Sequence, residues 1–447
     1  MEAVRVLLIS TYELGRQPFG LASPAAWLSG AGHDVTLADL SRSSLPRGAA
    51  EQAELIAFFL PMHTATRLFL KAVERVRALN PSAHLCAYGL YAPLNERLLR
   101  EAGVRTIIGG EFEQALANVA GQVFELGCSA STEISLERQQ FRVPDRTGLP
   151  PLASYARLAV NGSTRTVGYT EASRGCKHLC RHCPVVPVYG GVFRIVQPEI
   201  VLEDIRRQVA CGAEHITFGD PDFLNGPGHA VKIVEALHHE WPRLTYDATI
   251  KIEHLLKHRD LLGVLKTTGC VFVTSAVESL DDAVLEKLAK GHTRGDFLEA
   301  LDLTRAAEVP LSPTFIPFTP WTTLDSYRRF VRDLARLDLC EQVAPIQLAI
   351  RLLLPEGSLL LELPEIRGLA EPFDAHALCY PWRHPDPMVD TLWASIQELI
   401  KRDERRHSTR TETFRKIAEL ALGGPLGGEE PRPARATIPY LTEPWYC

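Results

Sequence analysis

The chain has 447 residues, of which 46% are hydrophobic and 23% are charged. This length suggests about two or three domains, and the composition is ordinary for a globular protein, so disorder throughout is excluded. With 48 Lys and Arg against 54 Asp and Glu, the formal net charge is -6. No broad basic field is present for nucleic acid, and a neutral partner or a small molecule is expected.

No apolar run in the sequence approaches the roughly 20 residues that a membrane-spanning helix needs. The start, Met-Glu-Ala-Val-Arg, lacks the basic region of a secretory signal peptide. We therefore expect a cytoplasmic protein that does not enter a membrane. Its 10 cysteines are too sparse for a disulfide framework, and clustered thiols in a reducing compartment more often bind metal. Three of them stand together, at Cys176, Cys180 and Cys183.

The amino-terminal part of the chain alternates between short apolar runs and helical patterns. Strand-like runs cover 4–10, 34–37, 55–60, 84–88 and 106–108, with helical stretches such as 22–32, 65–79 and 94–102 between them. Strands that alternate with helices predict a doubly wound parallel sheet. We expect this domain to cover 1–127, with its sheet ending near Leu126, and a linker with a short hairpin to cover 128–164.

The alternation of strands and helices resumes after the linker. Candidate strands cover 166–170, 215–218, 244–248, 272–276, 311–315 and 343–352, with helices such as 198–211 and 323–337 between them. Because each return to a parallel strand needs a crossover helix, these six β/α units predict a partial (β/α)6 barrel over 165–355. Chemistry is then expected at the carboxyl ends of the strands. A helical extension over 356–422 and a tail rich in Gly and Pro over 423–447 complete the chain.

The three clustered cysteines follow the first strand of this barrel, in EASRGCKHLCRHCP at 171–184. The spacing is Cys-x3-Cys-x2-Cys. Three thiolates in one loop can hold three irons of a [4Fe-4S] cluster and leave the fourth iron open to a substrate or cofactor. The alternative is a zinc site of three cysteines with His178 or His182. The place of the loop, at the end of a barrel strand, favours the cluster.

With this loop the chain resembles the radical S-adenosylmethionine (SAM) superfamily, whose signature is Cys-x3-Cys-x2-Cys after the first barrel strand. The resemblance implies that Cys176, Cys180 and Cys183 hold the cluster and that SAM chelates the open iron. It also implies that an electron from the cluster cleaves SAM to methionine and a 5'-deoxyadenosyl radical, which abstracts hydrogen. The family usually has an aromatic residue before the last cysteine, where this chain has His182, which we interpret as a packing residue.

Several residues fit the family's SAM-binding layout. Gly219, Asp220 and Asp222 follow the second strand, where the superfamily carries a glycine-rich or acidic motif that receives the SAM ammonium group. An Asp-Pro turn with Asp222 capping the next helix is the alternative. Glu278 and Ser279, at the end of the fourth strand, resemble a Glu-Ser segment that lies beside SAM.

The Glu-Ser segment is followed by Lys-Gly-His-Thr at 290–293, and both elements are common where such a barrel follows a cobalamin-binding-type domain. A helix cap is the alternative role of Glu278. Lys251 and Arg351 are basic residues at strand ends in apolar surroundings, and each is a candidate partner for the SAM carboxylate or a surface residue.

The amino-terminal domain resembles the cobalamin-binding domains of B12-type radical SAM enzymes. Gly-Gly-Glu-Phe-Glu at 109–113 stands where those domains often have a Gly-Glu segment. The Asp-x-His-x-x-Gly motif that supplies a histidine to cobalt in one class does not occur in this sequence. Either cobalamin binds without a protein imidazole, or the domain serves as a scaffold or substrate wall. His63 follows a strand end and is a candidate ligand contact or a cap.

The carboxyl end reads IPYLTEPWYC at 438–447. Together with 317–322 and 351–358 it resembles the radical SAM group named for a CUAEP or CCAEP tail. We hypothesise that the gene continues after Cys447 through a UGA codon read as selenocysteine, and that Cys447 belongs to a catalytic pair. The codon after Cys447 tests this.

These features predict a radical SAM enzyme with an α/β fold that uses a [4Fe-4S] cluster and SAM, with cobalamin as a further candidate cofactor. A small-molecule or peptide substrate and an external electron donor such as flavodoxin or ferredoxin are implied. A cobalamin-dependent radical SAM methyltransferase is the first alternative. A non-enzymatic zinc-bound scaffold is the second.

Overall fold

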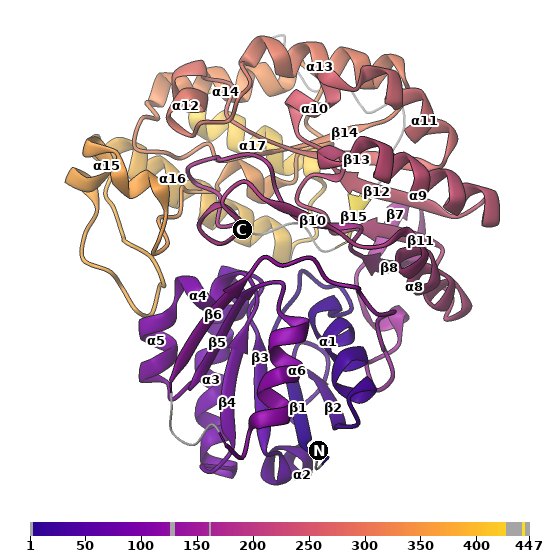
Figure 1. Ribbon diagram of the computed structural model, residues 1–447. Helices are drawn as coiled ribbons and strands as arrows, with labels where there is room; N and C mark the ends of the chain where they lie inside the picture. The colour runs from indigo at the N-terminus through magenta and orange to yellow at the C-terminus, as the bar shows by residue number, and fades with distance from the viewer. Residues whose placement is uncertain (1–2, 126–129, 161, 426–439, 443–447) are drawn as a thin grey trace.

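The computed structural model describes residues 3–125, 130–160, 162–425 and 440–442. Within these residues the chain forms two α/β units, with the amino-terminal sheet below a larger curled sheet in Figure 1. A helical carboxyl-terminal extension lies against the upper unit (Figure 1). No helix among the described residues is long and apolar enough to cross a membrane.

The amino-terminal unit is a doubly wound sheet of six parallel strands in the order β2-β1-β3-β4-β5-β6. The strands are β1 (Arg5–Ser10), β2 (Asp34–Asp39), β3 (Leu55–Phe59), β4 (His84–Tyr88), β5 (Thr106–Gly110) and β6 (Ser131–Ser135). The helices are α1 (Phe19–Gly30), α2 (Arg47–Gln52), α3 (His63–Leu79), α4 (Tyr91–Leu94), α5 (Glu96–Glu101) and α6 (Glu113–Gln122). Both sheet faces are covered, because apolar side chains of α2, α3 and α5 pack on one and those of α1 and α6 on the other.

The sheet does not end near Leu126, as the sequence suggested, because β6 adds a sixth strand beyond β5. Its sequence, STEIS, is polar and four of its five side chains are exposed. An edge strand needs no continuous apolar run, since only one of its sides is paired. The predicted hairpin is present as β7 (Arg157–Val160) and β8 (Ser163–Thr170), which pair antiparallel.

The second unit is a curled sheet in the order β14-β13-β12-β11-β8-β7-β15. Its parallel strands are β8, β11 (His215–Phe218), β12 (Thr245–Thr249), β13 (Cys270–Glu278) and β14 (Leu311–Phe315). Its covering helices are α8 (Pro198–Ala210), α9 (Pro227–Glu240), α10 (Ile252–Lys257), α11 (Leu262–Thr267), α12 (Asp282–Lys287), α13 (Arg294–Ala306) and α14 (Leu324–Arg336). The apolar faces of these helices, except that of α12, join the outer side of the sheet in the largest hydrophobic core, whereas Val284 of α12 packs in a separate cluster with residues of the carboxyl-terminal extension.

The sixth predicted barrel strand, over 343–352, is wrong. The segment instead forms a 3₁₀ turn, η4 (Pro345–Leu348), and keeps only one bridge, between Phe318 and Arg351. Pro345 has no N–H for a ladder, and the Gln347 side chain accepts the Phe315 N–H at 3.0 Å, where a strand backbone would have paired. The barrel is therefore partial.

The carboxyl-terminal extension contains α15 (Pro364–Leu369), α16 (Pro387–Arg405) and α17 (Arg410–Leu422). The amphipathic patterns predicted for α16 and α17 are confirmed, because Ile396, Phe414 and Ile417 enter the same core as the barrel helices. The short strand β15 (Tyr440–Leu441) then pairs with β7.

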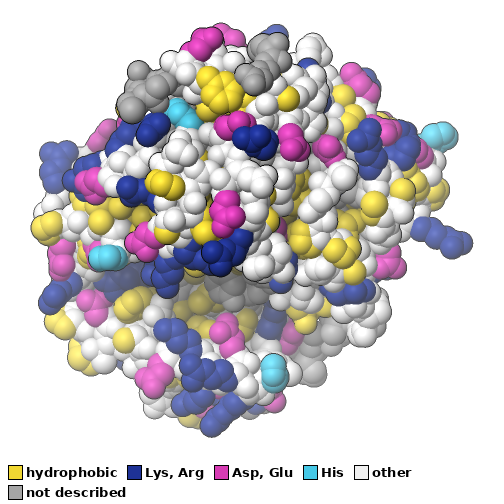
Figure 2. All heavy atoms as spheres, turned by 90° about the horizontal axis from the view of Figure 1, so that it is seen from below, with side chains coloured by type: hydrophobic (Ala, Val, Ile, Leu, Met, Phe, Trp, Pro, Cys, Tyr) yellow, Lys and Arg dark blue, Asp and Glu magenta, His cyan; other side chains and the backbone are white. Residues whose placement is uncertain are grey.

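Basic and acidic side chains are interspersed on the lower face of the molecule, which Figure 2 shows.

Candidate active site

The cysteine loop starts from a two-stranded ribbon at the carboxyl end of β8. Strand β9 (Ser173–Gly175) leads into the loop, and β10 (Phe193–Ile195) pairs antiparallel with it after the loop returns through α7 (Val186–Tyr189). Gly175 has a positive φ of 72°, and a Cβ there would lie 2.4 Å from the Tyr189 ring. Only glycine fits this approach, so the residue before Cys176 fixes how the loop begins.

The three thiols of this loop are free and form a donor set for a soft metal site. Cys180 is buried and Cys176 and Cys183 are partly buried. Burial, together with the neighbouring Cys180 and Cys176 thiols, raises the pKa of Cys183 to about 12. Without a bound metal the Cys183 thiol stays protonated, although Lys290 lies near enough to oppose the effect of burial, and metal binding would release its proton. Three free thiols on one loop fit an iron-sulfur cluster or another thiophilic metal.

Asp222 lies beside the cysteine loop. Its Oδ2 is 2.7 Å from His254 Nδ1 and 3.5 Å from His178 Nε2, so two imidazoles face this buried carboxylate. Burial favours the protonated carboxyl, but the facing imidazoles outweigh it and hold the pKa of Asp222 at about 2. Cys176, His178 and Asp222 also offer ligand atoms within 4.8 Å of one another. A buried carboxylate that stays charged beside a thiol and an imidazole fits a cation or an ammonium group bound at this place.

A second buried carboxylate, Glu278, faces the other side of the loop. It ends β13 just past a bulge, with a φ of 69° that side-chain-bearing residues rarely adopt. Its Oε1 is 3.1 Å from His182 Nε2 and 3.4 Å from Lys290 Nζ. Burial opposes the charge, but Lys290 and His182 outweigh it and hold the pKa of Glu278 at about 2. Ser279, the next residue, lines a pocket of about 560 Å³ at the amino-terminal ends of α12 and α14.

Asp220 and Gly219 contact the residues that precede the cysteine loop. Asp220 accepts hydrogen bonds from the Ser173 hydroxyl at 2.5 Å and the Ala172 N–H at 3.0 Å. Burial raises the pKa of Asp220 to about 7, against the effect of these hydrogen bonds. A Cβ on Gly219 would meet the Tyr169 hydroxyl at 1.9 Å, so this position accepts only glycine. Both residues shape the turn between β8 and β9.

The remaining predicted site residues divide into two groups. Lys251 is buried at the start of α10, and its Nζ lies 3.4 Å from Glu253, which in turn lies 3.5 Å from His178. The Arg351 guanidinium instead binds Asp390 at 2.6 Å and stacks 3.7 Å from the Trp382 ring centroid, both in the carboxyl-terminal extension. Lys251 therefore lies near the cysteine loop, whereas Arg351 is paired with a residue of the carboxyl-terminal extension.

Two further predicted positions lie away from the loop or outside the structure. His63 Nε2 lies 2.6 Å from the Ala377 carbonyl oxygen, in the extension. Cys447 lies outside the described residues. Sequence reasoning missed His254, which stands at mid-helix in α10 and reaches the site only because α10 follows the carboxyl end of β12. A histidine within the first turn after a barrel strand was the available signal.

The amino-terminal sheet directs its own strand ends toward the barrel, where doubly wound sheets bind ligands. Here the chain's own side chains occupy these ends: Phe59, Tyr88 and Phe112 pack with ring centroids 5.1 to 5.8 Å apart, and all three are buried. Glu111 and Glu113 are likewise buried and paired with Arg174. The ends of β3, β4 and β5 thus carry buried aromatic rings and paired carboxylates of the chain itself.

Residues 170–334 match the model of the family described as the Radical SAM superfamily. A hopanoid C-3 methylase of Methylococcus capsulatus is 27% identical over 170 residues, which are 38% of this chain and 32% of the methylase. The chain therefore spans about a third of that relative.

Two solved structures share the fold. The cobalamin-dependent SAM radical enzyme OxsB with aqua-cobalamin bound gives a TM-score of 0.71 at 14% identity, over 90% of this chain and 67% of that chain. The radical SAM methyltransferase TsrM from Kitasatospora setae, with cobalamin and a [4Fe-4S] cluster bound, gives 0.61 at 16% identity, over 75% of this chain and 73% of that one. Both likenesses extend beyond the barrel, because each covers far more of this chain than residues 170–334.

Proposed function

We propose that this chain, which contains a radical SAM domain at residues 170–334, binds a [4Fe-4S] cluster through Cys176, Cys180 and Cys183 and cleaves SAM reductively. One observation carries the proposal. Three free thiols stand on one loop at the carboxyl end of the first parallel barrel strand, beside the buried Asp222 carboxylate and the two histidines that face it. When bound, the cluster supplies an electron and one iron that is open to SAM.

The residues around the loop have complementary charges for an amino acid group. SAM carries an ammonium and a carboxylate on its methionine part. Asp222 is the anionic group that receives the ammonium, because its low pKa keeps it charged. Lys251 is the buried cation on the same side of the loop, and it binds the carboxylate. Gly219 lets the backbone approach closely.

The second carboxylate holds its place through cations of the chain. Lys290 and His182 fix Glu278 beside the last cysteine, with Ser279 turned to the neighbouring pocket. We assign Glu278 and Ser279 to the sugar and adenine side of SAM, since the ammonium side is taken by Asp222. The pocket of about 560 Å³ beside Ser279 is large enough for a small-molecule group.

Radical methyl transfer is the second candidate function. The names of the similar hopanoid C-3 methylase and of the structural neighbour TsrM favour it. A cobalamin-dependent form of that reaction needs a corrin at the strand ends of the amino-terminal sheet, where buried side chains of this chain lie. We therefore assign no step to cobalamin. The substrate is a small molecule or a peptide, and the electron comes from an external donor such as flavodoxin or ferredoxin.

Anaerobically reconstituted protein tests the proposal. We expect about four irons per chain and 5'-deoxyadenosine from SAM with a strong reductant. Both are lost when Cys176, Cys180 and Cys183 are replaced together by Ala. The control is Cys211→Ala, because Cys211 is an exposed thiol outside the loop. Zinc without iron, and no cleavage of SAM, would contradict the proposal and favour a zinc-bound scaffold.

A further inference from the structure

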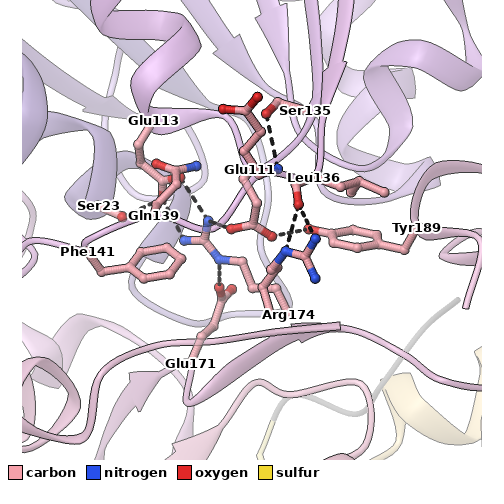
Figure 3. A network of polar contacts seen from close by, with 12 residues as sticks. Ser23, Glu111, Glu113, Ser135, Leu136, Gln139, Phe141, Glu171, Arg174 and Tyr189 are labelled. Carbon is pink, nitrogen blue, oxygen red and sulfur yellow. Dashed lines mark hydrogen bonds and ion pairs between the residues drawn. The ribbon is translucent and has the colours of Figure 1, made fainter. Parts of the chain in front are cut away.

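The ribbon that brackets the cysteine loop is attached to the amino-terminal sheet on both strands. Arg174 of β9 and Arg194 of β10 are cross-strand partners. Figure 3 shows the Arg174 guanidinium among the carboxylates of Glu111, Glu113 and Glu171. The Arg194 Nε donates to the Leu136 carbonyl oxygen at 2.6 Å, just after β6. The loop therefore leaves and returns through a ribbon that another unit holds.

Arg174 makes the strongest of these attachments. Its two terminal nitrogens donate to the two carboxylate oxygens of Glu113, at 2.6 and 2.9 Å, and its Nε donates to Glu171 at 2.7 Å. A third carboxylate, Glu111, lies 3.4 Å away. The paired oxygens of Glu113 give the fork geometry that only arginine satisfies. Because Glu113 is the first residue of α6, this fork joins the barrel to the end of the amino-terminal sheet.

Buried aromatic rings surround the Arg174 guanidinium and restrict its conformation. The side chain is 5% exposed, and its guanidinium lies 4.8 Å from the Phe112 ring centroid and 5.1 Å from that of Phe141. The Oε1 of Glu113 also accepts a hydrogen bond from the Ser23 hydroxyl at 2.6 Å, so the partner of Arg174 is itself held in place. Breaking the pair would leave an uncompensated charge in a buried place, which is strongly unfavourable.

The loop itself adds two contacts to the same surface. The Tyr189 hydroxyl, in α7 of the loop, donates to Glu111 at 3.1 Å. Leu94 of the amino-terminal unit packs with Val185 and Val188 in a small apolar cluster that Cys176 and Cys183 join. Two of the three cysteines are thus packed in a cluster to which both units contribute.

We propose that Arg174 is a positioning residue that pins the start of the cysteine loop to Glu113 and Glu111, so that the amino-terminal sheet sets the place and the electrostatic environment of the cluster. This inference rests on the proposed function. It gives the amino-terminal unit a role that needs no ligand of its own. Arg174 acts through the loop, since Gly175 alone separates it from Cys176.

The test uses reconstituted full-length protein and two variants of opposite charge effect, Arg174→Gln and Glu113→Gln. The midpoint potential of the cluster is measured by redox titration followed by electron paramagnetic resonance (EPR). Loss of the Arg174 cation destabilises the reduced cluster and lowers the potential, whereas loss of the Glu113 anion raises it. A role confined to folding would not move the potential in opposite directions.

The matched control is Arg146→Gln. Arg146 also makes a buried fork, to Asp204 at 2.9 Å, and joins the linker to α8 rather than to the cysteine loop. We expect it to lower the thermal midpoint and leave the potential unchanged. If Arg174→Gln does not fold, Glu113→Gln and Tyr189→Phe, which removes only the hydroxyl that binds Glu111, carry the test.

Potentials equal to wild type in the Glu113, Arg174 and Tyr189 variants would overturn the inference while the proposed function stands. Absence of a cluster in the wild type would overturn the proposed function itself. The two failures are therefore distinguishable.

Discussion

The two sheets turn their carboxyl edges toward each other and use them differently (Figure 1). At the end of β5 the buried carboxylates of Glu111 and Glu113 are paired with Arg174, within the chain itself. At the barrel edge, the buried Asp222 carboxylate stays charged and lies close to the partly buried His178 of the cysteine loop. The same position in an α/β fold thus serves for support in one unit and for ligand binding in the other.

The largest expected effect is the loss of the metal site. Replacing Cys183 alone by Ala removes one of three thiolates from a loop that has no spare cysteine in the range 171–192. We expect iron content to fall below half of wild type and SAM cleavage to disappear. Iron analysis and detection of 5'-deoxyadenosine measure both. Iron and cleavage equal to wild type in Cys183→Ala would remove the contrast between the two edges.

Asp222 tests whether the polar atoms at the barrel edge serve a ligand. Asp222→Asn keeps the shape of the side chain and removes the charge to which we assign the SAM ammonium in our proposal. The loss of one charge-assisted hydrogen bond predicts SAM binding weaker by roughly 10- to 100-fold. Calorimetry on the reconstituted protein measures it. The control is Asp220→Asn, because the Asp220 carboxylate accepts hydrogen bonds from Ser173 and Ala172 of the chain itself. Equal weakening in both variants would argue against a direct role for Asp222.

Asp220 predicts a pH dependence of stability in the metal-free protein. Its pKa is raised to about 7 by burial, above the roughly 3.9 of an unfolded chain. Between these values the folded state binds more protons, so this group lowers the free energy of unfolding as pH rises from about 4 to 7. The effect amounts to a few kcal/mol at most, at about 1.4 kcal/mol per pKa unit.

Urea unfolding at pH 5 and pH 8 measures this dependence in wild type and Asp220→Asn. We expect the variant to lose less stability than wild type between the two pH values, because an amide does not titrate. The same pH slope in both proteins would show that Asp220 is not the group responsible.

The smallest expected effect concerns cobalamin. Because the ends of β3, β4 and β5 are filled by Phe59, Tyr88, Glu111 and Phe112, we expect hydroxocobalamin not to bind stoichiometrically. Equilibrium dialysis followed by visible absorption measures corrin per chain. One corrin per chain would show that these side chains move aside. The amino-terminal edge would then be a second ligand site, and the comparison between the two edges would fail.

Much of this arrangement could be predicted from the sequence. The continuous apolar runs of β1, β3 and β4 and the spacing of the three cysteines are local signals. The structure has strands of the amino-terminal sheet at the three runs and a single loop at the cysteines. The hydrophobic pattern does not predict the polar edge strand β6, and it predicts a strand over 343–352 that the structure does not form. In both places pairing depends on neighbouring residues and not on hydrophobic pattern.

The contacts of single charged residues could not be predicted, because they join distant parts of the chain. Arg351 has the sequence surroundings expected of a ligand-binding cation, but its guanidinium is paired with Asp390, which lies 39 residues further along the chain. Arg174 and Glu113 are 61 residues apart and meet only when both units have formed. No periodicity in the sequence contains such a pairing.

The most direct test of the central claim is EPR of the reduced, reconstituted protein with and without SAM. A cluster held by Cys176, Cys180 and Cys183 leaves one iron open, and SAM bound there changes the signal. We predict a clear change on addition of SAM in wild type and a weaker one, at the same SAM concentration, in Asp222→Asn. A cluster signal that SAM leaves unchanged in wild type would contradict the account.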